Sequence, residues 1–396
     1  MRALLSYSVA LVLSLALIGC GDAPSDDALN DNSANEDANR TVVLENVESD
    51  DATFDVVDVV SGLEHPWAVA FLPDDRMLIT ERPGRLNLVD ADGTVEEVSG
   101  LPDIEAQNQG GLLDVVLHPE YEDNGWVYFT YSAPQDDGLT STTIARAQLD
   151  GTTLADLETL HVQDPPHEPG RHYGSRLLFM DDGTFLATIG DRGLRDPAQD
   201  LEDESGSTLR LNDDGSVPED NPFVGDDDAK DTIFSYGHRN QQGIDINPES
   251  GDVWAHEHGP RGGDELNIIQ AGANYGWPEA TYGTEYRDDS PIGIDPDEGD
   301  FVYPVLHWSP LSIAPSGMTF YTGDAFENWQ NDIFVGALAK EHIHRVVLDG
   351  DEVVHQEELM NEEIGRIRDL RTGPDGFLYI LNDESDGSLF RLEPSS

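Results

Sequence analysis

The stretch Ile367-Arg-Asp-Leu-Arg-Thr-Gly-Pro-Asp-Gly-Phe-Leu-Tyr-Ile380 decides the fold. A partly apolar strand leads into a turn of Gly, Pro and Asp, and a second strand follows with β-branched or aromatic residues. This pattern is typical of an antiparallel hairpin. The same unit occurs six times along the chain. The other five copies span residues 67–80, 113–130, 176–189, 243–255 and 317–335.

The segments between these copies contain short apolar runs and no long stretch of helical periodicity, which predicts a nearly all-β protein. Repeats of roughly 40–50 residues, here lengthened by loop insertions, are typical of four-stranded propeller blades. We therefore expect a six-bladed β-propeller of antiparallel blades over residues 53–396, with a strand near 54–60 closing the ring against the last blade. A β-sandwich or a pair of β domains is the alternative, but neither explains six copies of one hairpin.

The charge balance of the chain is strongly acidic. Its 396 residues include 80 Asp and Glu against 21 Lys and Arg, a net charge of −59, while 38% hydrophobic residues suffice for a packed core. Such a field repels phosphate backbones and excludes nucleic-acid binding. Only two of the cations are lysines, Lys230 and Lys340. We interpret this composition as adaptation to high salt, where charges are screened within about 3 Å at 1 M.

The first residues have the composition of an export signal. Arg2 precedes an apolar run over 10–18 that is too short to span a membrane, and the run ends at Gly19 and the only cysteine, Cys20. This resembles a bacterial lipoprotein signal; an ordinary signal with a chance cysteine is the alternative. We expect a signal peptide over 1–19, an acidic flexible tether over 20–52 from lipidated Cys20, and a lipid-anchored protein on the periplasmic or extracellular face of the cell envelope.

Five arginines lie near strand ends and Gly-rich turns in a chain that has few cations. Any one of them could form a structural ion pair with an Asp. As a set they favour an anionic ligand in the central channel, because the guanidinium fork matches a carboxylate. The five are Arg171, Arg176, Arg239, Arg366 and Arg368.

Histidines offer further candidates. His172 lies in a polar, Gly-rich segment, which favours a base at a site over a structural histidine. His256 with His258, and His342 with His344, have the i, i+2 spacing that places two rings on one strand face. Because no third ligand is obvious for either pair, we predict no metal site from them.

Six motifs together resemble the soluble quinoprotein sugar dehydrogenases, that is the glucose/sorbosone dehydrogenase family and especially its aldose sugar dehydrogenase branch. The resemblance runs from about residue 59 to 392, and the motifs occur in the order of the family. They are Gln-Gly-Gly-Leu-Leu-Asp (109–114), His-Tyr-Gly-Ser-Arg-Leu (172–177), Gly-His-Arg-Asn (237–240), Glu-His-Gly-Pro-Arg-Gly-Gly-Asp-Glu-Leu-Asn (257–267), Asn-Tyr-Gly-Trp-Pro (274–278) and Arg-Ile-Arg-Asp (366–369).

The resemblance implies a propeller that binds pyrroloquinoline quinone (PQQ) and calcium. His172 is then the general base, taking the proton of the anomeric hydroxyl of an aldose while hydride passes to the quinone. Arg239 stabilises the developing oxyanion, a lactone leaves, and electrons pass to an external quinone or redox protein. The implied PQQ contacts are Gln109, Arg239 and Asn240 at the quinone, and Arg366 and Arg368 at the carboxylates.

The resemblance also implies two calcium sites. The carbonyls of Gly259 and Pro260 match those that bind the calcium polarising the quinone, and Glu265 and Tyr275 match a second, structural site, in keeping with hard oxygen ligands. The expected partners are a small aldose and the acceptor, with no membrane contact beyond the lipid, in a monomer or dimer.

Two positions depart from the family pattern. Lys340 stands one residue beyond the position of the family lysine, so we expect it to point away, because one residue reverses strand facing. Arg171 stands where some members carry an acid. Two other classes compete with the dehydrogenase. A non-catalytic cell-surface propeller is disfavoured by the retained site residues, and a calcium-dependent lactonase by the arginine-rich positions.

Overall fold

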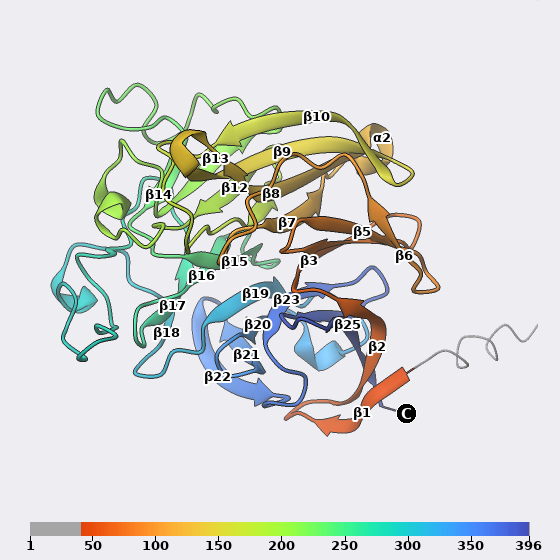
Figure 1. Cartoon of the computed structure of the whole chain (residues 1–396). Helices are drawn as coiled ribbons and strands as arrows, with labels where there is room; N and C mark the ends of the chain where they lie inside the picture. Colours follow the sequence, from red (N-terminus) through yellow and green to blue (C-terminus); the bar gives the residue numbers. More distant parts are fainter. Residues whose placement is uncertain (1–40, 396) are drawn as a thin grey trace, which may run out of the picture. The chain divides into compact units, whose positions relative to one another are not determined.

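A computed structural model describes residues 41–395, which form six antiparallel sheets arranged as a propeller (Figure 1). The innermost strand of every sheet is the first strand of one of the six repeated hairpins, and neighbouring inner strands contact one another around the ring. The predicted six-bladed, all-β propeller is therefore confirmed. Within the described range the only α-helix is α2 (Tyr121–Asn124), and no helix has the length and apolar character needed to cross a membrane.

The blades succeed one another in sequence order, and the strands of each blade run in order from the channel to the outer edge. The first three are β3 (Pro66–Phe71), β4 (Met77–Glu81), β5 (Arg85–Val89) and β6 (Val95–Val98); β7 (Leu112–Leu117), β8 (Trp126–Pro134), β9 (Thr140–Asp150) and β10 (Thr153–Val162); and β11 (Leu177–Phe179), β12 (Thr184–Ile189), β13 (Ser207–Asn212) and β14 (Ile233–Tyr236). The next two are β15 (Gln241–Ile246), β16 (Val253–Glu257), β17 (Asp264–Ile268) and β18 (Leu306–Trp308); and β19 (Pro315–Phe320), β20 (Ile333–Ala337), β21 (His342–Asp349) and β22 (Glu352–Leu359).

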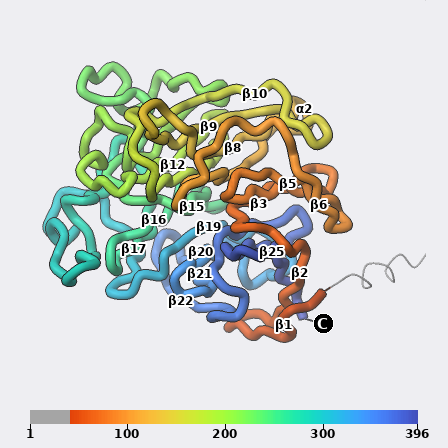
Figure 2. Tube along the Cα trace, in the orientation of Figure 1, coloured from red at the N-terminus to blue at the C-terminus, as the bar shows by residue number. Residues whose placement is uncertain are grey.

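The sixth blade closes the ring with both ends of the described chain. Its strands β23 (Ile367–Thr372), β24 (Leu378–Asn382) and β25 (Gly387–Pro394) come from the C-terminal part, and β2 (Thr53–Leu63) pairs with β25. Figure 2 shows this meeting of the red N-terminal and blue C-terminal strands. The prediction that residues 54–60 close the ring against the last blade is confirmed.

The expected tether differs from the structure at its C-terminal end. Residues 41–48 form β1 (Thr41–Glu48), which pairs with β2 as a fifth strand of the last blade, so the folded part begins at 41 rather than 53. Asp51 reaches the fifth blade, where it lies 2.7 Å from the buried guanidinium of Arg345. Pairing with β2 therefore orders a segment that its acidic composition alone marked as flexible. The predicted signal peptide and residues 20–40 lie outside the described range.

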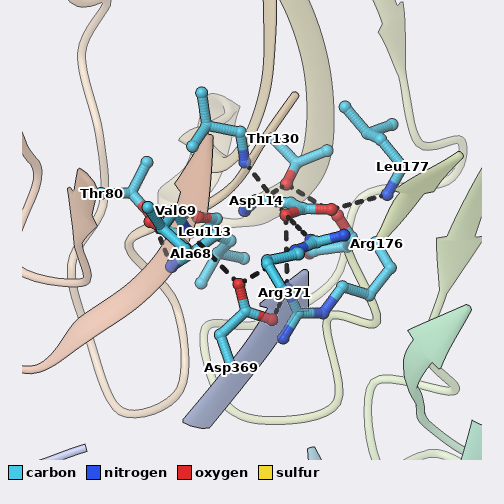
Figure 3. Close-up of polar contacts among 12 residues, drawn as sticks. Ala68, Val69, Thr80, Leu113, Asp114, Thr130, Arg176, Leu177, Asp369 and Arg371 are labelled. Carbon is cyan, nitrogen blue, oxygen red and sulfur yellow. Dashed lines mark hydrogen bonds and ion pairs between the residues drawn. The ribbon is translucent and has the colours of Figure 1, made fainter. Parts of the chain in front are cut away.

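An ion-pair network crosses the channel within the ring of inner strands (Figure 3). Arg176 lies 2.9 Å from Asp369 and 3.3 Å from Asp114, and Arg371 lies 3.1 Å from Asp114 and 3.2 Å from Asp369. Asp114, Asp369 and Arg176 are almost completely buried. This network fills the channel with paired charges and joins β7, β23 and the segment before β11.

Candidate active site

A cavity of about 350 Å³ opens at the end of the channel where the inner strands begin, and all six blades contribute to its wall. This placement follows from the fold, because the segments that enter the six inner strands converge on the axis. The lining residues are Trp67, Arg82, Asn108, Gln109, Leu113, Tyr173, Gly174, Asn240, Gln242, His258, Ala314, Leu338, Arg366, Arg368 and Asp383.

Positive charge dominates this wall, although the chain as a whole is acidic. Its three guanidiniums, from Arg82, Arg366 and Arg368, face one carboxylate, that of Asp383. Arg368 donates to Asp383 over 2.9 Å, yet its buried Nε–H has no hydrogen-bond partner in the described part of the chain. Arg366 donates to the carbonyl of Leu338 over 2.9 Å and remains 42% exposed at its side chain. These donors exceed the acceptors present, so the cavity is suited to an anion with several carboxylates.

A buried histidine–aspartate pair stands next to the cavity. The Nδ1 of His172 lies 2.6 Å from Asp191, which also accepts hydrogen bonds from the indole of Trp277 (2.8 Å) and the N–H of Gly193 (2.7 Å). Because a carboxylate only accepts, the proton of the ring lies on Nδ1 and the lone pair on Nε2. Asp191 thus fixes His172 in the tautomer of a base.

The electrostatics of the pair keep the imidazole neutral. Burial lowers the pKa of His172 below its ordinary value, outweighing the hydrogen bond that the ring donates to Asp191, and the Arg239 cation lowers it further. For Asp191, burial alone would raise the pKa, but the interaction with His172 and Arg239 holds it below the ordinary value. The site therefore offers a neutral base beside an ionised carboxylate near neutral pH.

The backbone of His172 is held in a strained position. Its φ of +56° lies in the left-handed region, which costs a non-glycine residue roughly 1–3 kcal/mol. Two contacts support it: the His172 N–H donates to Oε1 of Gln109 over 2.8 Å, and Oδ1 of Asn240 accepts from the N–H of Gly174 over 3.1 Å. Gln109 and Asn240 thus line the cavity and also position the histidine loop.

Arg239 lies beside the same pair. Its guanidinium donates to the carbonyl of His258 over 3.0 Å and packs on the ring of Trp277, 5.4 Å from the centroid. Its backbone N–H donates to Glu257. Arg239 is buried and close enough to lower the pKa of His172, so the structure brings His172, Arg239, Asn240 and Gln109 together beside the cavity.

The chain offers oxygen atoms that fit calcium at the first expected site. Gly259 and Pro260 are buried, and within residues 41–395 neither carbonyl accepts a hydrogen bond. The N–H of Gly259 donates to Asp264 over 2.9 Å, which fixes this turn. Two uncommitted carbonyls are the hard ligands that calcium prefers.

The second expected site is a cavity of about 10 Å³, roughly the room of one small occupant. Its wall includes Glu257, Glu265 and Tyr275, together with Gly259 of the first site and the Arg239 cation. Burial and then the facing Glu257 raise the pKa of Glu265 well above its ordinary value, as expected where a cation is needed. The phenol of Tyr275 is engaged with Ile268 and the N–H of Gln270, so only its carbonyl is available as a ligand.

Several predicted residues lie elsewhere. Arg176 belongs to the channel network and not to the cavity. Lys340, which we expected to point away, is exposed and outside the cavity wall. His256 and His258 gather no third ligand within residues 41–395; the only such group there is built on His342 and His344, with Glu358 on the neighbouring strand.

The sequence analysis missed Asp191, Arg82 and Asp383. Asp191 follows β12 in a Gly-Asp-Arg-Gly turn of the kind that marked the other site segments. Arg82 lies in a Glu-Arg-Pro-Gly turn, so it could have been found by the criterion used for the other arginines, a scarce cation beside a Gly-containing turn. Nothing in its local sequence distinguishes Asp383 from the other acidic residues.

A β-propeller with a buried His–Asp base beside a cation-lined cavity has the layout of an enzyme that acts with a bound anionic group. The family model "Glucose / Sorbosone dehydrogenase" matches residues 63–391. The chain belongs to this family of quinoprotein sugar dehydrogenases.

Individual relatives agree with this assignment. The chain is 43% identical to aldose sugar dehydrogenase YliI of Escherichia coli K12, over 87% of this chain and 94% of the relative. The crystal structure of the soluble aldose sugar dehydrogenase of E. coli in its apo-form matches with a TM-score of 0.84 and 41% identity, covering 86% of this chain and all of the other. The PQQ-bound aldose sugar dehydrogenase of Streptomyces coelicolor matches with a TM-score of 0.69 and 27% identity, covering 86% and 99%.

Proposed function

We propose that this protein oxidises C1 of aldose sugars to lactones with PQQ as its cofactor. When bound, PQQ accepts the hydride of the sugar and passes electrons to an external acceptor. The observation that carries the proposal is the His172–Asp191 pair, which stands next to a cavity rich in guanidiniums. The PQQ-bound relative of S. coelicolor supports the choice of cofactor.

His172 acts as the general base in this proposal. Nδ1–H is committed to Asp191, so Nε2 takes the proton from the anomeric hydroxyl. As the imidazole becomes cationic, the ionised carboxylate of Asp191 stabilises it across 2.6 Å. Arg239, buried on the ring of Trp277, supplies a fixed positive charge for the oxyanion that develops.

The remaining residues would bind and orient PQQ and calcium. Arg366 and Arg368 have guanidinium donors left for the carboxylates of PQQ, and Gln109 and Asn240 offer amides at the cavity wall. The carbonyls of Gly259 and Pro260 would bind a calcium ion, and Glu265 with the carbonyl of Tyr275 a second one. We further propose that the protein is exported, anchored through lipid on Cys20 and adapted to high salt, in keeping with its net charge of −59.

The test is dye-linked oxidation of glucose, galactose and xylose in high salt with calcium, with and without added PQQ. PQQ-dependent dye reduction is the expected result. We expect His172→Gln to lower kcat about 10²–10⁴-fold, because the base is lost, while PQQ affinity in calorimetric titration changes little. His355→Gln, at an exposed histidine of β22, is the matched control and should behave as the wild type.

The pH dependence gives a second readout. An ordinary histidine has a pKa of about 6.5. Since burial lowers the pKa of His172, its ring is still neutral at pH values just below 6.5. The acid limb of the kcat/KM profile should therefore lie below pH 6.5. A limb above that value contradicts His172 as the base, and absence of both sugar oxidation and PQQ binding refutes the dehydrogenase.

A further inference from the structure

Three potential metal ligands converge on one face of the β21–β22 hairpin, outside the cavity. His342 and His344 lie two residues apart on β21, which places both rings on the same face. The register of β22 sets Glu358 directly opposite His344, so its side chain shares that face. One ligand atom from each of the three residues lies within 4.8 Å of the others.

Hydrogen bonds hold both rings in place. Nδ1 of His342 lies 3.3 Å from the carbonyl of Lys340, an acceptor, so Nδ1 carries the proton and Nε2 the lone pair. Nε2 of His344 lies 2.9 Å from Oε1 of Gln356 and also accepts from the indole N–H of Trp308 over 3.3 Å, so its two partners favour different tautomers. The ring of Trp308 packs edge-on against His344.

The two nitrogens that remain are buried without partners. His342 is 1% exposed and His344 6%, and among residues 41–395 neither Nε2 of His342 nor Nδ1 of His344 has a hydrogen-bond partner. A buried polar atom left without a partner is costly, and such atoms in a native fold call for an explanation.

We propose that His342 Nε2, His344 Nδ1 and the carboxylate of Glu358 form a binding site for a divalent transition metal, with zinc as its foremost occupant. Two imidazoles and one carboxylate form a known zinc ligand set, with water in the fourth position. The other nitrogen of each histidine lies within hydrogen-bond distance of a carbonyl oxygen, the arrangement that orients metal-binding histidines. Ligand atoms around tetrahedral zinc lie roughly 3.3 Å apart, so the three side chains, whose ligand atoms lie within 4.8 Å of one another, would draw together around the ion.

The metal site would stabilise the loop between β20 and β21. The carbonyl of Lys340 accepts from His342, and two residues earlier Leu338 lines the cavity and accepts from Arg366. None of the three ligands lines the cavity. The proposal is therefore independent of sugar oxidation, and we expect the loss of Glu358 to leave the basal activity unchanged.

The test is a zinc titration of the full-length protein, stripped with chelator and then supplied with excess calcium so that oxygen-rich sites are filled. We expect one zinc ion per chain by calorimetry and an increase in Tm on binding. Glu358→Gln should weaken zinc binding at least about 10-fold, because a ligand is lost. Glu352→Gln removes another exposed carboxylate of β22 and is the matched control, expected to bind zinc as the wild type does.

Cobalt(II) supplies a spectroscopic readout of the same site. Binding to the wild type and to Glu352→Gln should give the intense visible bands of four-coordinate cobalt, and Glu358→Gln should lose them. If the wild type binds no zinc, or if the two variants bind it equally well or are equally weakened, the proposal is wrong. Since Glu358 is exposed and lies at the blade edge, its replacement does not threaten folding.

Discussion

Both the channel network and the cavity contain arginines, but the arginines of the channel are neutralised and those of the cavity are in excess. In the channel, Arg176 and Arg371 are matched by Asp114 and Asp369, so every buried charge has a partner within 3.3 Å. In the cavity, three guanidiniums meet the single carboxylate of Asp383. What distinguishes the two regions is the balance of charge, because both are enclosed by the same inner strands.

This difference shows how an acidic chain builds an anion site. A balanced buried network contributes to stability only while it is complete, since removal of one member leaves an uncompensated charge. An unbalanced set of cations stays partly exposed and keeps donors free, as Arg366 and the Nε of Arg368 do. Arginines in the channel should therefore control folding, and those in the cavity should control binding.

The largest expected effect is that of Arg176→Met in the channel. The variant leaves Asp114 and Asp369 to share Arg371, and it removes the hydrogen bond from Nε to the carbonyl of Gln242 (2.7 Å). We expect the free energy of unfolding to fall by about 3–5 kcal/mol, the usual result of breaking a buried ion pair. Urea unfolding at fixed high salt measures it.

A double variant controls for the loss of volume. Arg176→Met with Asp114→Asn leaves Asp369 and Arg371 as a matched pair, so part of the lost stability should return. If the double variant is as unstable as the sum of the single variants, charge balance is not what holds the channel together.

The next effect is that of Arg366→Gln in the cavity. Its side chain is 42% exposed and gives up one hydrogen bond, to Leu338, so stability should change by no more than about 1 kcal/mol. PQQ affinity should fall about 10–100-fold, the equivalent of one charge-assisted hydrogen bond of roughly 1.5–3 kcal/mol. Calorimetric titration of PQQ measures it. Unchanged PQQ binding would show that the cavity cations do not serve the cofactor.

Much of this comparison could be read from the sequence. Six copies of one hairpin predict the blades, and strand alternation places Arg366 and Arg368 on one face. Which arginine is neutralised could not be predicted, because Asp114 and Asp369 reach Arg176 from strands of other blades. Local sequence reports the spacing of residues along one strand and not the register between blades.

The same limit explains two other differences. Glu358 lies 14 residues from its cross-strand partner His344, so the third ligand of the histidine pair was not recognised until the register of β22 was known. Residues 41–48 look like tether because their apolar run, 41–44, is too short to fold alone, and pairing with β2 is what orders them. In each case a strand pairing decided the outcome.

The smallest expected effect tests whether scarcity alone makes an arginine important. Arg287 has a side chain that is 90% exposed and forms an ion pair with Asp288, at 3.2 Å. We expect Arg287→Gln to change the free energy of unfolding by less than about 0.5 kcal/mol and to leave PQQ affinity unchanged, because an exposed pair contributes little. The same urea and calorimetric measurements apply. If this variant is as unstable as Arg176→Met, the net charge of −59 acts over long range, and each cation stabilises the fold by reducing that charge wherever it lies. At molar salt, screening within about 3 Å opposes that outcome, so repeating the measurement at lower salt separates the two explanations.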